Sequence, residues 1–115
     1  MENTIDRYTM ITVDGKEYKL QYTIRAIINL EKQLGNHSIL DTLANIPFDF
    51  GDTFVFLKYG LQGGGHKLSD AQVEDIMYGL FETLNFGELQ ALIIETLTKS
   101  GAIGRVDSPK ANKKK

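Results

Sequence analysis

The sequence predicts a mainly helical protein with a small β part, an α+β fold. Two observations lead to this prediction. Residues 8–23 alternate apolar and polar side chains about a central Asp14-Gly15, a pattern typical of a β-hairpin. Most of the remaining chain, to about residue 104, carries apolar residues at helical spacing between capping and glycine signals. Because 115 residues have room for only one domain, we expect an N-terminal hairpin packed on four to five short helices, in a single domain over residues 1–104.

The predicted hairpin turns at Asp14-Gly15, the dipeptide favoured in two-residue type I′ turns. If Val13 pairs with Lys16, the apolar side chains of the two strands share one face of the hairpin. Those side chains are Ile11, Val13, Tyr18, Leu20 and Tyr22. An isolated hairpin is marginally stable in water, so this face must lie on helices or pair with another chain.

Three helical segments are predicted between the hairpin and the glycine-rich stretch. The first covers residues 24–34 and ends at Gly35. A short second segment runs from Ser38 to about Asn45, and the third covers residues 53–61. The expected buried stripe of the first helix consists of Ile24, Ile27, Ile28 and Leu34.

Two longer amphipathic helices are predicted in the second half of the chain. Ser69 with Gln72, and Asn85 with Glu88, have the spacing of helix-starting capping boxes. Ser100-Gly101 is expected to end the last helix. The predicted apolar faces consist of Val73, Ile76, Met77, Leu80, Phe81 and Leu84, and then of Leu89, Leu92, Ile93 and Leu97.

The stretch GLQGGGHKLS, residues 60–69, is close in spacing to a phosphate-binding loop. Such a loop follows a strand and places a lysine directly after its last glycine. Here the preceding segment is predicted to be helical, and His66 occupies the lysine position. We therefore interpret the stretch as a joint between two helices, in which Gly63 takes the left-handed conformation that ends the third helix.

No arrangement of residues predicts catalysis, a cofactor or a metal site. The chain has no cysteine, and its two histidines, His37 and His66, are isolated and predicted to be surface loop residues. Asp70, Glu74 and Asp75 lie near the start of a predicted helix, where the helix dipole favours acidic side chains. We therefore expect a protein that is not an enzyme.

Charge and hydropathy exclude further classes of partner. Residues 1–104 hold eight of the thirteen basic residues and fourteen of the fifteen acidic ones, so this part of the chain is acidic and a poor match for nucleic acid. The apolar runs are far shorter than the ~20 residues of a transmembrane helix, and the polar start has no signal core. We expect a cytoplasmic protein with no membrane partner and a disordered basic tail over residues 105–115.

Five of the eleven aromatic residues fall within twelve positions, residues 48–59. They are Phe48, Phe50, Phe54, Phe56 and Tyr59. One interpretation is that the hairpin and the last two helices sandwich this segment. The other is a partly exposed apolar patch, which in a soluble protein usually marks a binding surface. For the second interpretation, the predicted partner surface comprises these five residues and Ile94.

Taken together, residues 8–104 resemble the tail assembly chaperones of long-tailed bacteriophages and prophages. The resemblance rests on ITVDGKEYKLQYTIRAIINLEKQLG at 11–35, the phenylalanine-rich helix, LSDAQVEDIMYGL at 68–80 and FGELQALIIETLTKSGAIG at 86–104. It implies a non-enzymatic protein that binds the tape measure protein and keeps it soluble. It further implies that the protein recruits tail tube subunits in the cytoplasm of the bacterial host and is absent from the mature virion.

The resemblance also implies a longer form made by ribosomal frameshifting near the end of the short form, through which the tail tube protein could be recruited. Lys113, Lys114 and Lys115 have adenine-rich codons and mark the candidate frameshift region. The alternative is that these lysines are an ordinary solvated charge run. The protein sequence does not separate the two.

Two other functions are compatible with the sequence. The chain could be a structural tail or head–tail connector subunit whose hairpin extends the sheet of a neighbour. It could instead be a small inhibitor or regulator of a host protein. The small core, the hairpin edge and the surplus of aromatic residues also permit a homo-oligomer.

Overall fold

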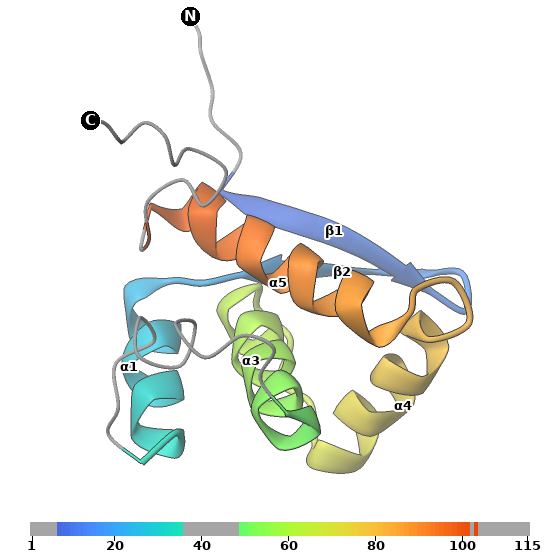
Figure 1. The fold of residues 1–115 in the computed structure, drawn as a ribbon, viewed down its shortest axis with the longest axis horizontal. Coiled ribbons are helices and arrows are strands. Elements are labelled where there is room, and N and C mark those ends of the chain that lie inside the picture. The colour runs from blue at the N-terminus through green and yellow to red at the C-terminus, as the bar shows by residue number, and fades with distance from the viewer. Residues whose placement is uncertain (1–6, 36–48, 102, 104–115) are drawn as a thin grey trace, which may run out of the picture.

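A two-stranded hairpin and four helices make up the part of the chain that the computed structural model describes, residues 7–35, 49–101 and 103 (Figure 1). The strands are β1 (Tyr8–Val13) and β2 (Lys16–Gln21), and the helices are α1 (Ile24–Gln33), α3 (Phe50–Gly63), α4 (Asp70–Leu80) and α5 (Phe86–Ser100). The predicted α+β fold is confirmed. The short helix predicted from Ser38 and the basic tail lie outside the described residues.

The hairpin has the predicted register, with Val13 opposite Lys16 and Ile11 opposite Tyr18. Asp14 and Gly15 have φ angles of 52° and 77°, and a type I′ turn requires positive φ at both positions. The predicted apolar face is the inner one, since Ile11, Val13, Leu20 and Tyr22 are buried there. Tyr18 is partly buried against the same core.

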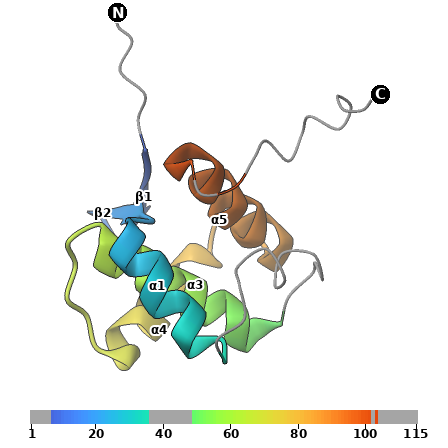
Figure 2. The same cartoon turned by 90° about the vertical axis from the view of Figure 1, so that its left-hand side faces the viewer.

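Helix α3 lies at the centre of the fold. It packs against β2, α1, α4 and α5, and it stands between α1 and α4 beneath the hairpin (Figures 1 and 2). The helix begins at Phe50, three residues earlier than predicted, because the Asp49 side chain accepts a hydrogen bond from the Asp52 amide at 2.8 Å and caps the first turn. The fully buried residues of α3 follow one face of the helix, and because other elements adjoin it, side chains beside that face are partly buried as well.

The predicted buried stripe of α1 is wrong in part. Ile24 is 80% exposed and Ile28 is 38% exposed, whereas Ala26 and Leu30 are buried. The reason is that α1 packs against α3 on one side, and the small Ala26, not Ile24 or Ile28, lies where the two helices approach closely. A Cβ placed on Gly63 of α3 would lie only 3.2 Å from the Ala26 Cβ, so the two helices approach closely there.

Both predicted capping boxes are present in the structure. Ser69 and Gln72 exchange side chain to backbone hydrogen bonds of 3.2 and 2.8 Å at the start of α4, and Asn85 and Glu88 do so at the start of α5. Helix α4 ends at Leu80, before the predicted Leu84. The caps therefore fix the beginnings of these helices more sharply than the apolar pattern fixes their ends.

The glycine-rich stretch is a helix-to-helix joint, as predicted, but Gly63 is not its left-handed residue. Gly63 lies inside α3, and Gly65, with φ of 97°, takes the left-handed conformation. Gly63 and Gly64 are needed for another reason. A Cβ on either one would overlap a backbone carbonyl oxygen of β2, that of Gln21 or of Lys19. These glycines therefore allow the end of α3 to dock directly on the strand.

His66 lies in the joint, as predicted, but it is not isolated. Its Nε2 atom accepts a hydrogen bond from the backbone N–H of Lys19 at 2.9 Å, and its ring packs edge-on against Tyr18 with 5.3 Å between centroids. The histidine therefore anchors the joint to β2. The second histidine, His37, lies outside the described residues.

Tyr22, between the end of β2 and the start of α1, places its hydroxyl group in the core. Its hydroxyl donates a hydrogen bond of 2.7 Å to the carbonyl oxygen of Phe56, which ties the end of the hairpin to the middle of α3. The side chain is only 3% exposed. Burial raises the pKa of the Tyr22 phenol above its ordinary value of 10.0, because a buried phenolate would lose its hydration.

Tyr22→Phe is expected to lower the free energy of unfolding by about 1–2 kcal/mol at about pH 7, since it removes a buried hydrogen bond. The difference from the unmodified protein should shrink towards pH 11. Above the ordinary phenol pKa the unfolded chain releases the Tyr22 proton and the folded chain keeps it, so this residue's contribution to stability falls as pH rises. Urea unfolding of both proteins at the two pH values measures this. A difference that stays constant with pH would contradict the role assigned to Tyr22.

Candidate functional site

Three phenylalanines from the ends of three helices meet on the surface. Phe50 is the first residue of α3, Phe81 caps the end of α4, and Phe86 is the first residue of α5. Phe50 and Phe86 are stacked with 4.2 Å between ring centroids, and Phe81 stands edge-on to them at 6.1 and 6.5 Å. The caps that begin α3 and α5 thus also place two of the three rings.

The cluster continues along α4 into an apolar surface pocket. The pocket has a volume of about 390 Å³ and is lined by Phe50, Glu74, Met77, Tyr78 and Phe81. Phe50 is 59% exposed and Tyr78 is 76% exposed, which is unusual for side chains of this size. We call the surface formed by Phe50, Met77, Tyr78, Phe81 and Phe86 the aromatic face. Exposed apolar patches of this kind mark sites where proteins bind other proteins.

Acidic side chains accompany the aromatic face. Glu74 lines the pocket, Glu82 follows Phe81 and is exposed, and Asp49 and Asp52 flank Phe50 at the start of α3. Partial burial, and then the nearby charge of Asp49, raise the pKa of Asp52. Within the part of the chain that the structure describes, none of these four carboxylates forms an ion pair with a basic side chain. The face therefore has an apolar centre and an acidic surround.

The structure separates the residues of the predicted partner surface. Of its described residues, only Phe50 lies on the aromatic face. Phe54, Tyr59 and Ile94 are partly buried against the core, and the Tyr59 hydroxyl donates a hydrogen bond to Gln33 of α1. Phe48 lies outside the described residues.

Phe56 is fully buried and packs edge-on against Tyr22, so it belongs to the core and has no exposed surface to offer a partner. We correct its assignment accordingly. The two interpretations of the aromatic segment thus each apply to part of α3. Its middle is enclosed by neighbouring elements, and its first turn is exposed.

The sequence predicts part of the aromatic face. The apolar stripe of α4 places Met77 and Phe81 on its core side, and the structure confirms this, since Met77 is buried and Phe81 packs against the core, while both also line the pocket. The apolar pattern does not indicate Tyr78 or Phe86. The position of two phenylalanines next to capping residues does indicate that they lie near the surface. Phe50 and Phe86 each directly follow a capping residue, so both had to lie at the first turn of a helix, near a surface.

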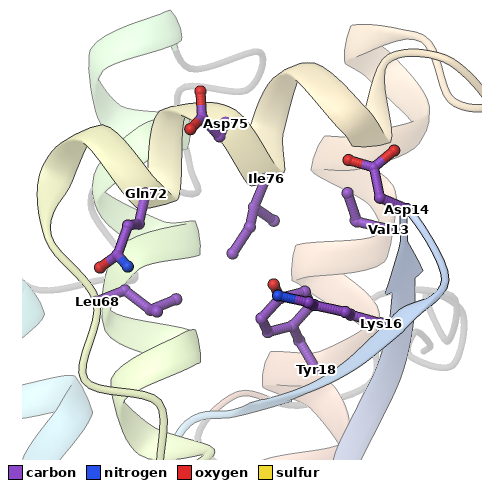
Figure 3. Close-up of a pocket in the computed structure, with 8 residues that line it drawn as sticks. All are labelled: Val13, Asp14, Lys16, Tyr18, Leu68, Gln72, Asp75 and Ile76. Carbon is purple, nitrogen blue, oxygen red and sulfur yellow. The ribbon is translucent and has the colours of Figure 1, made fainter.

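A second pocket lies between the hairpin turn and α4 (Figure 3). It has a volume of about 230 Å³, and Figure 3 shows Leu68 and Ile76 pointing towards Tyr18 across it. Its charged lining residues are Asp14, Lys16 and Asp75. The lining includes no serine, cysteine or histidine, so it lacks the nucleophile and histidine base of a hydrolytic site.

The described residues also contain no group of three or more histidine, cysteine or acidic side chains placed to hold a metal ion. Among the same residues, no helix has the length and hydropathy needed to cross a membrane. The aromatic face is therefore the best candidate for a functional site in the described part of the chain.

The comparison with known families places this fold among proteins of the phage tail. A family model described as "Phage tail tube protein, GTA-gp10" matches residues 8–100, a range that includes all six described elements. The chain is therefore a phage tail-related protein. It belongs to the phage tail tube protein family, GTA-gp10. Neither a curated protein nor a solved structure matches the chain.

Proposed function

We propose that this protein is a non-enzymatic tail assembly chaperone. It binds the tape measure protein and keeps it soluble, and it helps to recruit tail tube subunits in the cytoplasm of the bacterial host. The observation that carries the proposal is the aromatic face, an exposed apolar surface built from three helix ends on a phage tail-related protein.

The shape and charge of the aromatic face suit a helical client. Its pocket lies along α4, and Phe50 of α3 lines it with Phe86 of α5 stacked on that ring, so an amphipathic helix can lay its apolar side against this surface. Phe50 and Tyr78 supply rigid aromatic anchors of the kind that dominate protein interfaces. The acidic surround favours a client segment whose apolar stripe is flanked by lysine or arginine.

A structural tail subunit is the second candidate function, and the description of the family as tail tube proteins favours it. The two functions differ in where the protein ends up. A chaperone leaves before the particle is complete, whereas a subunit stays in it.

The chaperone function is tested by co-expressing the tape measure protein of the encoding phage or prophage with the chain and with the double variant Phe50→Ser, Tyr78→Ser. We expect the amount of soluble, co-purified tape measure protein to be at least about tenfold lower with the variant. This corresponds to a loss of about 1.4 kcal/mol or more of binding free energy. Ile24→Ser is the control, because Ile24 is also a large exposed apolar residue but lies on α1, near the end of α3 opposite Phe50. Equal losses with the control and the double variant would reject the aromatic face as the client site.

Mass spectrometry of purified particles and of the soluble complex separates the two functions. A chaperone is expected in the complex and absent from particles, and peptides extending past Lys115 would identify a frameshifted form. A stoichiometric amount of the chain in finished particles would establish the structural subunit instead.

A further inference from the structure

The two outer edges of the hairpin differ. In an antiparallel pair, directly opposed residues point their backbone N–H and C=O groups either towards each other or both away. Lys19 donates its N–H to His66, on the side away from β1, and Lys19 is opposite Met10. The backbone groups of Met10 therefore point outward from the other edge. Because the pattern alternates, those of Tyr8 and Thr12 point the same way.

The outer edge of β2 is covered, and that of β1 is open. On β2, His66 accepts the Lys19 N–H, and Gly63 and Gly64 lie against the carbonyl groups of Gln21 and Lys19. On β1, Lys99 of α5 donates to the Tyr8 carbonyl at 3.2 Å. Within residues 7–35, 49–101 and 103, the outward backbone groups of Met10 and Thr12 have no hydrogen-bond partner.

The open edge has little of the usual protection against strand pairing, since Lys99 covers only the Tyr8 carbonyl at its start. Exposed edge strands normally carry lysine, proline or inward-pointing charges that oppose pairing. The six residues of β1, YTMITV, contain no charge and no proline, and most of them favour extended structure. The covered strand β2, in contrast, has three charged residues, Lys16, Glu17 and Lys19. The outward-facing Met10 is also 47% exposed.

We propose that β1 is a self-association edge, whose occupant is β1 of a second copy of this chain. The two strands run antiparallel about a two-fold axis at Met10, so that Tyr8 of each copy faces Thr12 of the other. Three outward residues per strand form up to about six backbone hydrogen bonds across the axis, in two of which the Tyr8 carbonyl accepts from Thr12 of the other copy in place of Lys99. These bonds join the hairpins into a four-stranded sheet.

Charge confines the approach of a second copy to this strand and orientation. The body of the protein is acidic and repels a second copy over most of its surface. The neutral strand is an exception, since antiparallel pairing at this register places no like charges opposite one another. A contact made by one strand from each copy buries less than the ~1,200–2,000 Å² of a standard stable interface. The dimer is therefore reversible and forms as concentration rises.

The pairing is read directly from backbone amide hydrogen exchange of the purified chain over a range of concentrations, together with its mass by analytical ultracentrifugation. The amides of Met10 and Thr12 are expected to exchange rapidly in the monomer and at least about tenfold more slowly in the dimer. The Ile11 amide is the internal control, because it faces β2 at every concentration. Dimer formation without slower exchange at Met10 and Thr12 would overturn the proposal.

Charge variants at the axis test the register. Met10→Lys and Met10→Glu each place like charges opposite one another in a homodimer, so each variant is expected to be monomeric, and an equimolar mixture to recover the dimer. Gln21→Lys adds a charge on β2, away from the axis, and should dimerise like the unmodified chain. Circular dichroism verifies that each variant is folded. A monomeric unmodified chain at high concentration, or a mixture that stays monomeric, would contradict the proposed pairing.

Discussion

Gly64→Ala is expected to lower the free energy of unfolding by about 3 kcal/mol or more, enough to unfold a substantial share of a marginally stable domain. The added Cβ would overlap the backbone carbonyl oxygen of Lys19 and lie 2.6 Å from its carbonyl carbon. A backbone group in a paired strand cannot rotate aside as a side chain can. Either α3 moves away from β2 or the strand distorts, and both changes disturb the core around Leu20 and Leu61.

Two other glycine variants serve as controls for this prediction. Gly65→Ala meets no atom within 4 Å and should lose only the about 1–2 kcal/mol of a left-handed alanine. Gly79→Ala meets a methyl group of the buried, β-branched Val13, which can yield only by changing its rotamer. Its loss should still be smaller than that of Gly64→Ala, because the overlap is with a side chain and not with the backbone. Urea unfolding ranks the three variants. If Gly64→Ala were the mildest of them, α3 could not be docked on β2 as described.

Phe56→Ala is expected to lower the free energy of unfolding by about 3–5 kcal/mol, the usual effect of removing a large buried ring. Phe56 is fully buried beside Tyr22, so removal of its ring leaves a cavity in the core next to the middle of α3. The same substitution at Phe50, six residues earlier in the helix, should lower stability by only about 1 kcal/mol, because it removes an exposed stacking partner.

Thermal and urea unfolding of the two alanine variants measure this contrast. The expected effects on binding are the reverse, since only Phe50 contributes surface to the aromatic face. Similar losses of stability in both variants would mean that α3 is not oriented with Phe56 inward and Phe50 outward.

The features predicted correctly from the sequence depend on residues close together in the chain. The Asp14-Gly15 turn fixes the strand register, and the capping pairs at Ser69 and Asn85 satisfy amides only three residues away. These interactions join residues at most about three positions apart in the sequence. The types of those residues therefore indicate the local structure without knowledge of the packing.

The features that could not be predicted depend on which elements become neighbours. The buried side of α1 is set by its contact with α3 at Gly63, and the sequence of α1 offers isoleucines on the other side as well. The aromatic face requires Phe50, Phe81 and Phe86, from three separate helices, to converge. Neither arrangement has a local signature, because both arise from the packing of the whole domain.

The covering of β2 by His66 and the paired glycines also limits how far an assembly can grow. A sheet with two open edges can add copies indefinitely and form a fibre, whereas a sheet with one open edge is complete after a single addition. The contact between the end of α3 and β2 therefore caps the sheet, so that the hairpin can add a strand only at β1 and cannot polymerise through both edges.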